Sequence, residues 1–168
     1  MRGTIQGAVS APETISASRE GGLVLISLQG VECGLPLRRV REILRMVALT
    51  AVPGAPEWLA GMLNLRGATV PVIDLRRRLG LSPAVVGLET PIVVVEGSST
   101  AVAVIADRVS AVYMDLESWP EPLDAAWGRD APVIGTVQVG SRLIVVLDLD
   151  LIVTAAEELQ LPESLSGA

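Results

Sequence analysis

The chain has 168 residues, half of them hydrophobic, with a mean hydropathy of +0.52, a formal net charge of −6 and no histidine. This length and apolar content are enough for one compact unit with a sizeable core, and no apolar run approaches the roughly 18 residues of a membrane span. The lack of histidine removes the commonest general base and metal ligand, and the acidic balance disfavours nucleic acid as a partner.

Short, β-branched apolar segments dominate the sequence. The predicted strands are Leu23–Leu28, Met62–Leu65, Thr69–Ile73, Ile92–Val95, Val102–Ile105, Val133–Val139 and Leu143–Leu147. Turn residues separate them at Gln29-Gly30, Arg66-Gly67, Glu96-Gly97-Ser98-Ser99 and Gly140-Ser141. These intervals are typical of antiparallel barrels rather than of units with long crossover helices. The fold class is therefore predicted to be mainly β.

Two short helices are predicted among these strands. One runs from Leu37 to about Leu44, because Pro36 suits the start of a helix. The other spans Leu75–Leu79. Asp74 is expected to cap its amino end, and Gly80 is expected to end it.

The two ends of the chain differ from its middle in composition. Residues 1–21 mix small polar residues with isolated charges, lack the apolar run of a secretory signal, and are predicted to be a flexible N-terminal arm. Residues 156–168 are predicted to be a C-terminal tail, with a short helix from about Thr154 to Glu163. The single cysteine, Cys33, excludes an internal disulfide and is compatible with the cytoplasm.

The chain also contains a degenerate internal repeat. In each of two segments, Gly61–Leu75 and Gly135–Leu149, thirteen positions separate the first glycine from an aspartate that follows an apolar strand. A second correspondence joins Val40–Ile43 to Val109–Val112. Each half is thus predicted to be a small barrel of about five strands that shares apolar surface with the other and folds with it as one unit.

Carboxylates are the remaining candidates for chemistry. Asp74, Asp107 and Asp148 each follow an apolar strand, where a carboxylate usually caps the next backbone amides. On a strand, Asp148 and Asp150 would lie on the same face and form a weak cation site. No glycine-rich phosphate loop is present. The capping interpretation is preferred, so no catalytic residue, cofactor or metal is predicted.

Charge and turn chemistry indicate recognition instead. Residues 38–78 hold eight arginines against three acids, a local net charge of +5, and the rest of the chain carries −11. This segment is either a solvated basic face or a steering face for an acidic partner. Arg66, in a tight turn, is either a partner anchor or an exposed turn residue, and in the second interpretation Val40 and Ile43 are ordinary core.

In order and spacing, the chain resembles the CheW family over residues 22–155. The matching segments are Leu23–Leu28, Cys33–Leu37, Val40–Ile43, Val52–Pro56, Gly61–Arg76, Ile92–Val95, Ala106–Val109 and Leu143–Asp148. The most specific of them reads Asn64-Leu65-Arg66-Gly67, followed after three residues by Pro71-Val72-Ile73-Asp74-Leu75-Arg76.

The resemblance implies two intertwined five-stranded Src-homology-3-like β-barrels with short helices and no catalytic activity. It implies a cytoplasmic scaffold, recruited to membrane receptor arrays, that couples chemoreceptors to a CheA-type histidine kinase. The implied partners are the regulatory domain of the kinase and the cytoplasmic tip of the receptor, without nucleic acid or membrane insertion. By motif match, the partner-binding residues are Val40, Glu42, Ile43, Asn64, Leu65, Arg66 and Gly67.

Two alternatives stay open at this point. One is a regulator of a kinase in a non-flagellar pathway, such as twitching or gliding motility. The other belongs to a different class, a small carboxylate-dependent or metal-dependent enzyme that uses Asp148 and Asp150.

Overall fold

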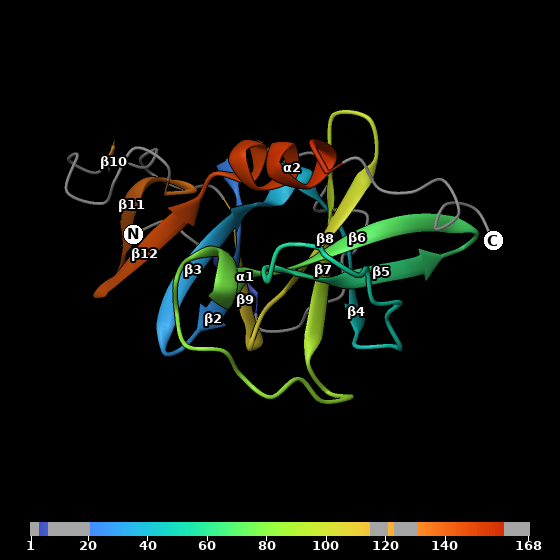
Figure 1. Ribbon diagram of the computed structural model, residues 1–168. Coiled ribbons are helices and arrows are strands. Elements are labelled where there is room, and N and C mark those ends of the chain that lie inside the picture. Colours follow the sequence, from blue (N-terminus) through green and yellow to red (C-terminus); the bar gives the residue numbers. More distant parts are fainter. Residues whose placement is uncertain (1–3, 7–20, 115–120, 123–130, 160–168) are drawn as a thin grey trace. The chain divides into compact units, whose positions relative to one another are not determined.

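The computed structural model describes residues 4–6, 21–114, 121–122 and 131–159. The chain is mainly β and divides into two compact units, residues 1–40 with 107–149 and residues 41–106 with 150–168 (Figure 1). Most of the predicted N-terminal arm and residues 160–168 of the predicted tail lie outside the described residues. The chain thus enters each unit twice.

The first unit is a sheet with the strand order β1-β9-β2-β3-β12-β11-β10. Its strands are β1 (Thr4–Gln6), β2 (Leu23–Leu28), β3 (Val31–Pro36), β9 (Arg108–Met114), β10 (Glu121–Pro122), β11 (Val133–Val139) and β12 (Arg142–Leu147). All neighbouring pairs are antiparallel except β3 and β12, which run parallel. Leu23, Leu25, Ile144 and Val146 are fully buried and form the centre of its core.

The second unit is a five-stranded sheet with the order β4-β7-β8-β6-β5. Its elements are β4 (Val40–Arg45), β5 (Leu59–Leu65), β6 (Ala68–Asp74), α1 (Leu75–Arg78), β7 (Pro91–Glu96), β8 (Ala101–Ile105) and α2 (Leu149–Glu157). Strands β6 and β8 run parallel. Val72, Ile92, Val94 and Ala103 are fully buried in its core.

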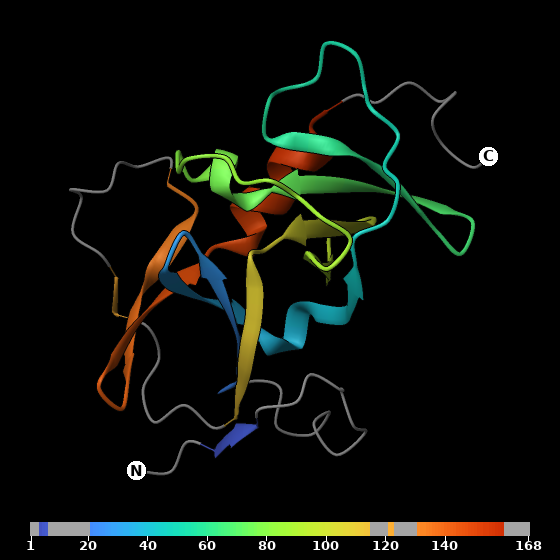
Figure 2. The same cartoon turned by 90° about the horizontal axis from the view of Figure 1, so that it is seen from below.

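The internal repeat is present as two hairpins, β5–β6 and β11–β12 (green and orange in Figure 2). Leu59 faces Ile73 and Gly61 faces Val72 across a register shift in the first hairpin. The second repeats this pattern 74 residues later, between β11 and β12. The last strand of each hairpin then pairs in parallel with a strand from elsewhere in its unit. Each unit therefore contains the same motif, a hairpin with a register shift whose last strand pairs in parallel with a third strand.

These features confirm the predicted fold class. Each predicted strand coincides with or lies inside an observed one, and all four predicted turns join hairpin strands. The Src-homology-3-like description fits, but both sheets are open rather than closed rings. In the second unit, a bridge between Thr50 and Met62 extends the edge at β5, with N–H···O distances of 2.9 and 2.8 Å.

The predicted helix from Leu37 to Leu44 is wrong. Only Leu37–Arg39 forms one turn of 3₁₀-helix, and β4 begins at Val40. Val40 and Ile43 are β-branched, which favours a strand, and β4 lies beside β7 in the sheet. Tertiary pairing therefore decided the structure of this segment, although Pro36 suits a helix start.

Several further elements depart from the sequence analysis. Helix α2 begins at Leu149, not at about Thr154 as predicted. Asp148 and Asp150 do not share a strand, because β12 ends at Leu147 and α2 begins at Leu149. Strand β3, which contains Gly34, was not predicted, and neither was β9. A Cβ atom at Gly34 would lie 2.9 Å from Leu23 Cδ1 and 3.2 Å from Ile144 Cγ2, so this glycine marks close packing in the core.

Helix α1 forms as predicted. The side chain of Asp74 caps its amino end and accepts a hydrogen bond of 3.3 Å from the Arg77 N–H. Gly80, at a φ of +73°, follows the last turn.

Candidate surface site on the second unit

The predicted motif Asn64-Leu65-Arg66-Gly67 forms the tight turn between β5 and β6. Leu65 pairs with Ala68, so Arg66 and Gly67 are the two central residues, with φ values of +51° and +85°. Positive φ at both positions is typical of a type I′ hairpin turn, and glycine is favoured at the second one. The Asn64 Oδ1 accepts a hydrogen bond of 3.0 Å from the Gly67 N–H. The motif therefore holds Arg66 at the end of a rigid hairpin.

Arg66 reaches from this turn to Glu42 on β4. Its Nη1 and Nη2 donate to the two carboxylate oxygens of Glu42 at 2.6 and 2.9 Å. The side chain of Arg66 is 72% exposed and that of Glu42 is 26% exposed. The hydrogen bonds from Arg66 lower the pKa of Glu42 and, in turn, raise that of Arg66. The forked pair ties the turn to a strand that is more than twenty residues away in sequence.

The remaining predicted site residues differ in accessibility. Asn64 and Gly67 are exposed, whereas Ile43 and Leu65 are half-buried. Val40 is only 6% exposed, so its side chain belongs to the core. The structure thus brings Glu42, Asn64, Arg66 and Gly67 together at one surface.

Several arginines of residues 38–78 are paired with acids. Arg45 lies 3.5 Å from Glu89, and Arg77 lies 3.4 Å from Glu57 and 3.6 Å from Asp74. The exposed pairs of Arg45 with Glu89 and of Arg77 with Glu57 contribute little to stability. The positive charge of the segment is therefore partly balanced within the unit.

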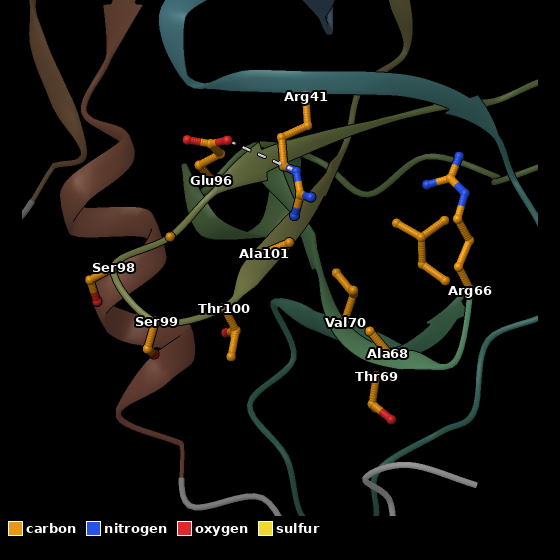
Figure 3. A pocket seen from close by; sticks show the side chains of 12 residues that line it. Arg41, Arg66, Ala68, Thr69, Val70, Glu96, Ser98, Ser99, Thr100 and Ala101 are labelled. Carbon is orange, nitrogen blue, oxygen red and sulfur yellow. Dashed lines mark ion pairs between the residues drawn. The ribbon is translucent and has the colours of Figure 1, made fainter.

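A pocket beside the turn includes residues that sequence reasoning did not select. It has a volume of about 620 Å³ and lies between the β5–β6 turn and the β7–β8 loop (Figure 3). Arg41, Thr69 and the loop Ser98–Thr100 contribute to its lining. Glu157, at the end of α2, binds Ser98 of that loop from 59 residues further along the chain. A contact over such a separation has no local sequence signal.

The carboxylates considered for chemistry have structural partners. Asp74 caps α1, and an oxygen of Asp107 accepts a hydrogen bond of 2.8 Å from the Gln29 N–H. Among the described residues, no group of three acidic, cysteine or histidine side chains could hold a metal ion. Cys33 is buried, and this burial raises the pKa of its thiol to about 11. In the same part of the chain, the helices are too short or too polar to cross a membrane.

Comparison with known proteins places this geometry in a family. Residues 22–157 match the family model described as CheW-like domain. The chain is 30% identical over 141 residues to Chemotaxis protein CheW of Rhizobium meliloti, which covers 82% of this chain and 91% of the relative. It is 28% identical over 134 residues to Chemotaxis protein CheW of Bacillus subtilis, covering 77% and 85%. Protein FrzA of Myxococcus xanthus is 37% identical over 76 residues, covering 45% and 48%.

A solved structure shows the same fold. The crystal structure of scaffolding protein TtCheW from Thermoanaerobacter tengcongensis matches with a TM-score of 0.72 and 27% identity, covering 88% of this chain and 92% of that one. The family match begins at residue 22, just before β2, and ends with α2, so it includes every described element except β1. The chain therefore belongs to the family of proteins with a CheW-like domain.

Proposed function

We propose that this protein is a non-catalytic scaffold that couples chemoreceptors to a CheA-type histidine kinase. Family membership supports the role, since relatives with high coverage are named as chemotaxis proteins and a structural relative as a scaffolding protein. The observation that carries the proposal in this chain is Arg66, presented on a rigid turn and joined to Glu42 at the surface.

The proposed partners are the regulatory domain of the kinase and the cytoplasmic tip of the receptor. The surface assigned to them consists of Glu42, Ile43 and the turn Asn64–Gly67, together with the buried Val40 of the same motif. The proposed location is the cytoplasm, with recruitment to membrane receptor arrays. A side chain that forms forked hydrogen bonds within a rigid frame suits specific recognition, because little conformational freedom is lost on binding.

A second candidate is a regulator of a kinase in a chemosensory pathway without flagella. It is favoured by the relative Protein FrzA, which is not named for chemotaxis. That similarity covers less than half of either chain, so it supports this candidate less than the relatives with high coverage support the first.

The test is a charge exchange between Arg66 and Glu42. Binding of both partners from the same organism is measured by calorimetry for the wild type, Arg66→Glu, and the double variant Arg66→Glu with Glu42→Arg. Arg66→Glu should weaken binding about 30-fold, as expected for an anchor at the centre of an interface. Arg66→Glu also places two carboxylates side by side and should lower the melting temperature. The double variant restores an ion pair of opposite charges, so it should recover the melting temperature but not the affinity for the partners. A wild type that binds neither partner at micromolar concentration would disprove the scaffold role.

A further inference from the structure

The pocket beside the turn, here called the trough, is lined in part by small apolar side chains. Ala68 and Val70 on β6 and Ala101 on β8 contribute to its lining (Figure 3). Strands β6 and β8 are parallel, so the trough opens at the amino ends of both. These small apolar side chains leave room for a peptide backbone. A volume of about 620 Å³ falls within the usual range of ligand sites.

One wall of the trough, the loop Gly97–Thr100, is fixed by the last residue of α2. The backbone N–H groups of Ser98 and Ser99 donate to Glu157 Oε1 at 3.1 and 3.2 Å. Their hydroxyl groups donate to Oε2 at 2.5 Å and to Oε1 at 3.3 Å. These four hydrogen bonds, led by that from the Ser98 hydroxyl, lower the pKa of Glu157. The wall is therefore preformed rather than shaped by a ligand.

The opposite wall is held by a forked ion pair. Arg66 at the β5–β6 turn is held by its two hydrogen bonds to Glu42, and Thr69 follows on β6. With both walls fixed, a segment that enters the trough need not order them, and this lowers the entropic cost of binding.

Arg41 is the cation that is most readily available to a ligand. Figure 3 shows its guanidinium group extending over the trough between the two walls. Its Nε lies 4.0 Å from Glu96 Oε1, and the two side chains are 54% and 61% exposed. A long, exposed pair is weak, so exchanging Glu96 for another carboxylate costs little.

We propose that the trough receives an extended segment of a partner protein, and that a carboxylate of this segment takes the place of Glu96 at Arg41. The guanidinium group supplies a forked pair of donors for that carboxylate. The hydroxyl group of Thr100, on the wall formed by the β7–β8 loop, can bond the backbone of the segment (Figure 3). This inference rests on the scaffold role and adds a surface beyond the Asn64–Gly67 turn.

A first experiment tests the trough without any partner. The ¹⁵N-labelled protein is titrated with a blocked hexapeptide of alternating valine and glutamate, and with a control peptide in which glutamine replaces glutamate. The expected result is a set of amide shifts at Thr69, Val70, Thr100 and Ala101 with the glutamate peptide only. Equal shifts with both peptides, or shifts confined to other residues, would overturn the proposal.

A second experiment compares Arg41→Gln with a matched control, Arg45→Gln. Arg45 lies on the same strand and forms a similar exposed pair with Glu89, but it does not line the trough. Arg41→Gln should weaken peptide and partner binding about tenfold, whereas Arg45→Gln should change both less than twofold. Partners that bind both variants equally would refute the trough and leave the scaffold role intact. If the wild type shows the expected peptide shifts but binds neither partner, the trough is supported and the scaffold role is refuted.

Discussion

Arg66 and Glu42 form a forked pair at the surface, where water competes for both groups. Their geometry is better than that of the ion pairs formed by Arg41, Arg45 and Arg77, because both contacts are 2.9 Å or shorter whereas those pairs are separated by 3.4 Å or more. At the scale of single residues, this pair does more to fix the position of the turn than to raise overall stability.

The lowered pKa of Glu42 makes a prediction about pH. A carboxyl group whose pKa is lower in the folded protein than its ordinary value near 4.5 stabilises the fold above that value. Its contribution is lost as the pH falls through the lowered pKa. Urea midpoints at pH 7 and pH 3 should therefore differ less for Glu42→Gln than for the wild type. An identical difference in the two proteins would show that the pair has no effect on stability.

Asp74 makes a second prediction at this scale. Asp74→Ala should lower the free energy of unfolding by about 1 kcal/mol, because the amino end of α1 loses its cap. Asp74→Asn is the matched control, since asparagine caps helices nearly as well without the charge. Urea denaturation compares the three proteins. An asparagine variant as unstable as the alanine variant would assign the effect to the ion pair with Arg77.

At the scale of elements, Gly97 makes the β7–β8 loop possible. A Cβ atom there would lie 2.1 Å from the backbone oxygen of Thr100 and 2.8 Å from Glu157 Oε1. Gly97→Ala should therefore shift the loop, break its bonds to Glu157 and cost about 1–3 kcal/mol. At Gly87, in contrast, a Cβ atom would meet nothing within 4 Å. Thermal unfolding of Gly97→Ala beside Gly87→Ala measures the difference, and equal melting temperatures would contradict this role of the loop.

Local patterns predicted the hairpins well. Alternating apolar segments and glycine-containing turns located β2 and β11 to the residue, because period, propensity and turn chemistry agree there. The same patterns predicted a helix where β4 forms, because a proline followed by charged residues is typical of the start of a helix. They also missed β3, where a glycine serves core packing. In both strands, contacts with distant residues decide the structure.

The candidate site was predictable only in part. The Asn64–Gly67 turn has a strong local signal, since Gly67 suits the positive φ at the second central position of a type I′ hairpin turn. Its pairing with Glu42 and the bonds of Glu157 to Ser98 and Ser99 join residues that lie far apart in sequence. A single sequence carries no record of such contacts, so the second wall of the trough appears only in the structure.

At the scale of the whole molecule, the two units meet along the chain without linkers. The boundary at residues 40 and 41 falls inside β4, and that at residues 149 and 150 falls inside α2. At the third boundary, the Ala106 N–H donates to Pro91 in one unit, and the Asp107 N–H donates to Ser27 in the other. A strand and a helix thus continue through two of the boundaries, and at the third each neighbouring residue is hydrogen-bonded within its own unit.

We propose from this continuity that the two units unfold together. Differential scanning calorimetry should show one transition whose calorimetric and van't Hoff enthalpies agree. Val40 and Leu149, the first residues of β4 and α2, belong to the first unit, so loss of order there would disturb the start of both elements. Two resolved transitions would show instead that the units are independently stable.

The central claim is that one chain binds a kinase and a receptor at once. Sedimentation velocity of the protein mixed with the kinase regulatory domain and the receptor tip, at micromolar concentrations, tests it most directly. The scaffold role predicts a species that contains all three components and diminishes with Arg66→Glu. Two partners that exclude each other, or that leave the protein sedimenting alone, would contradict it.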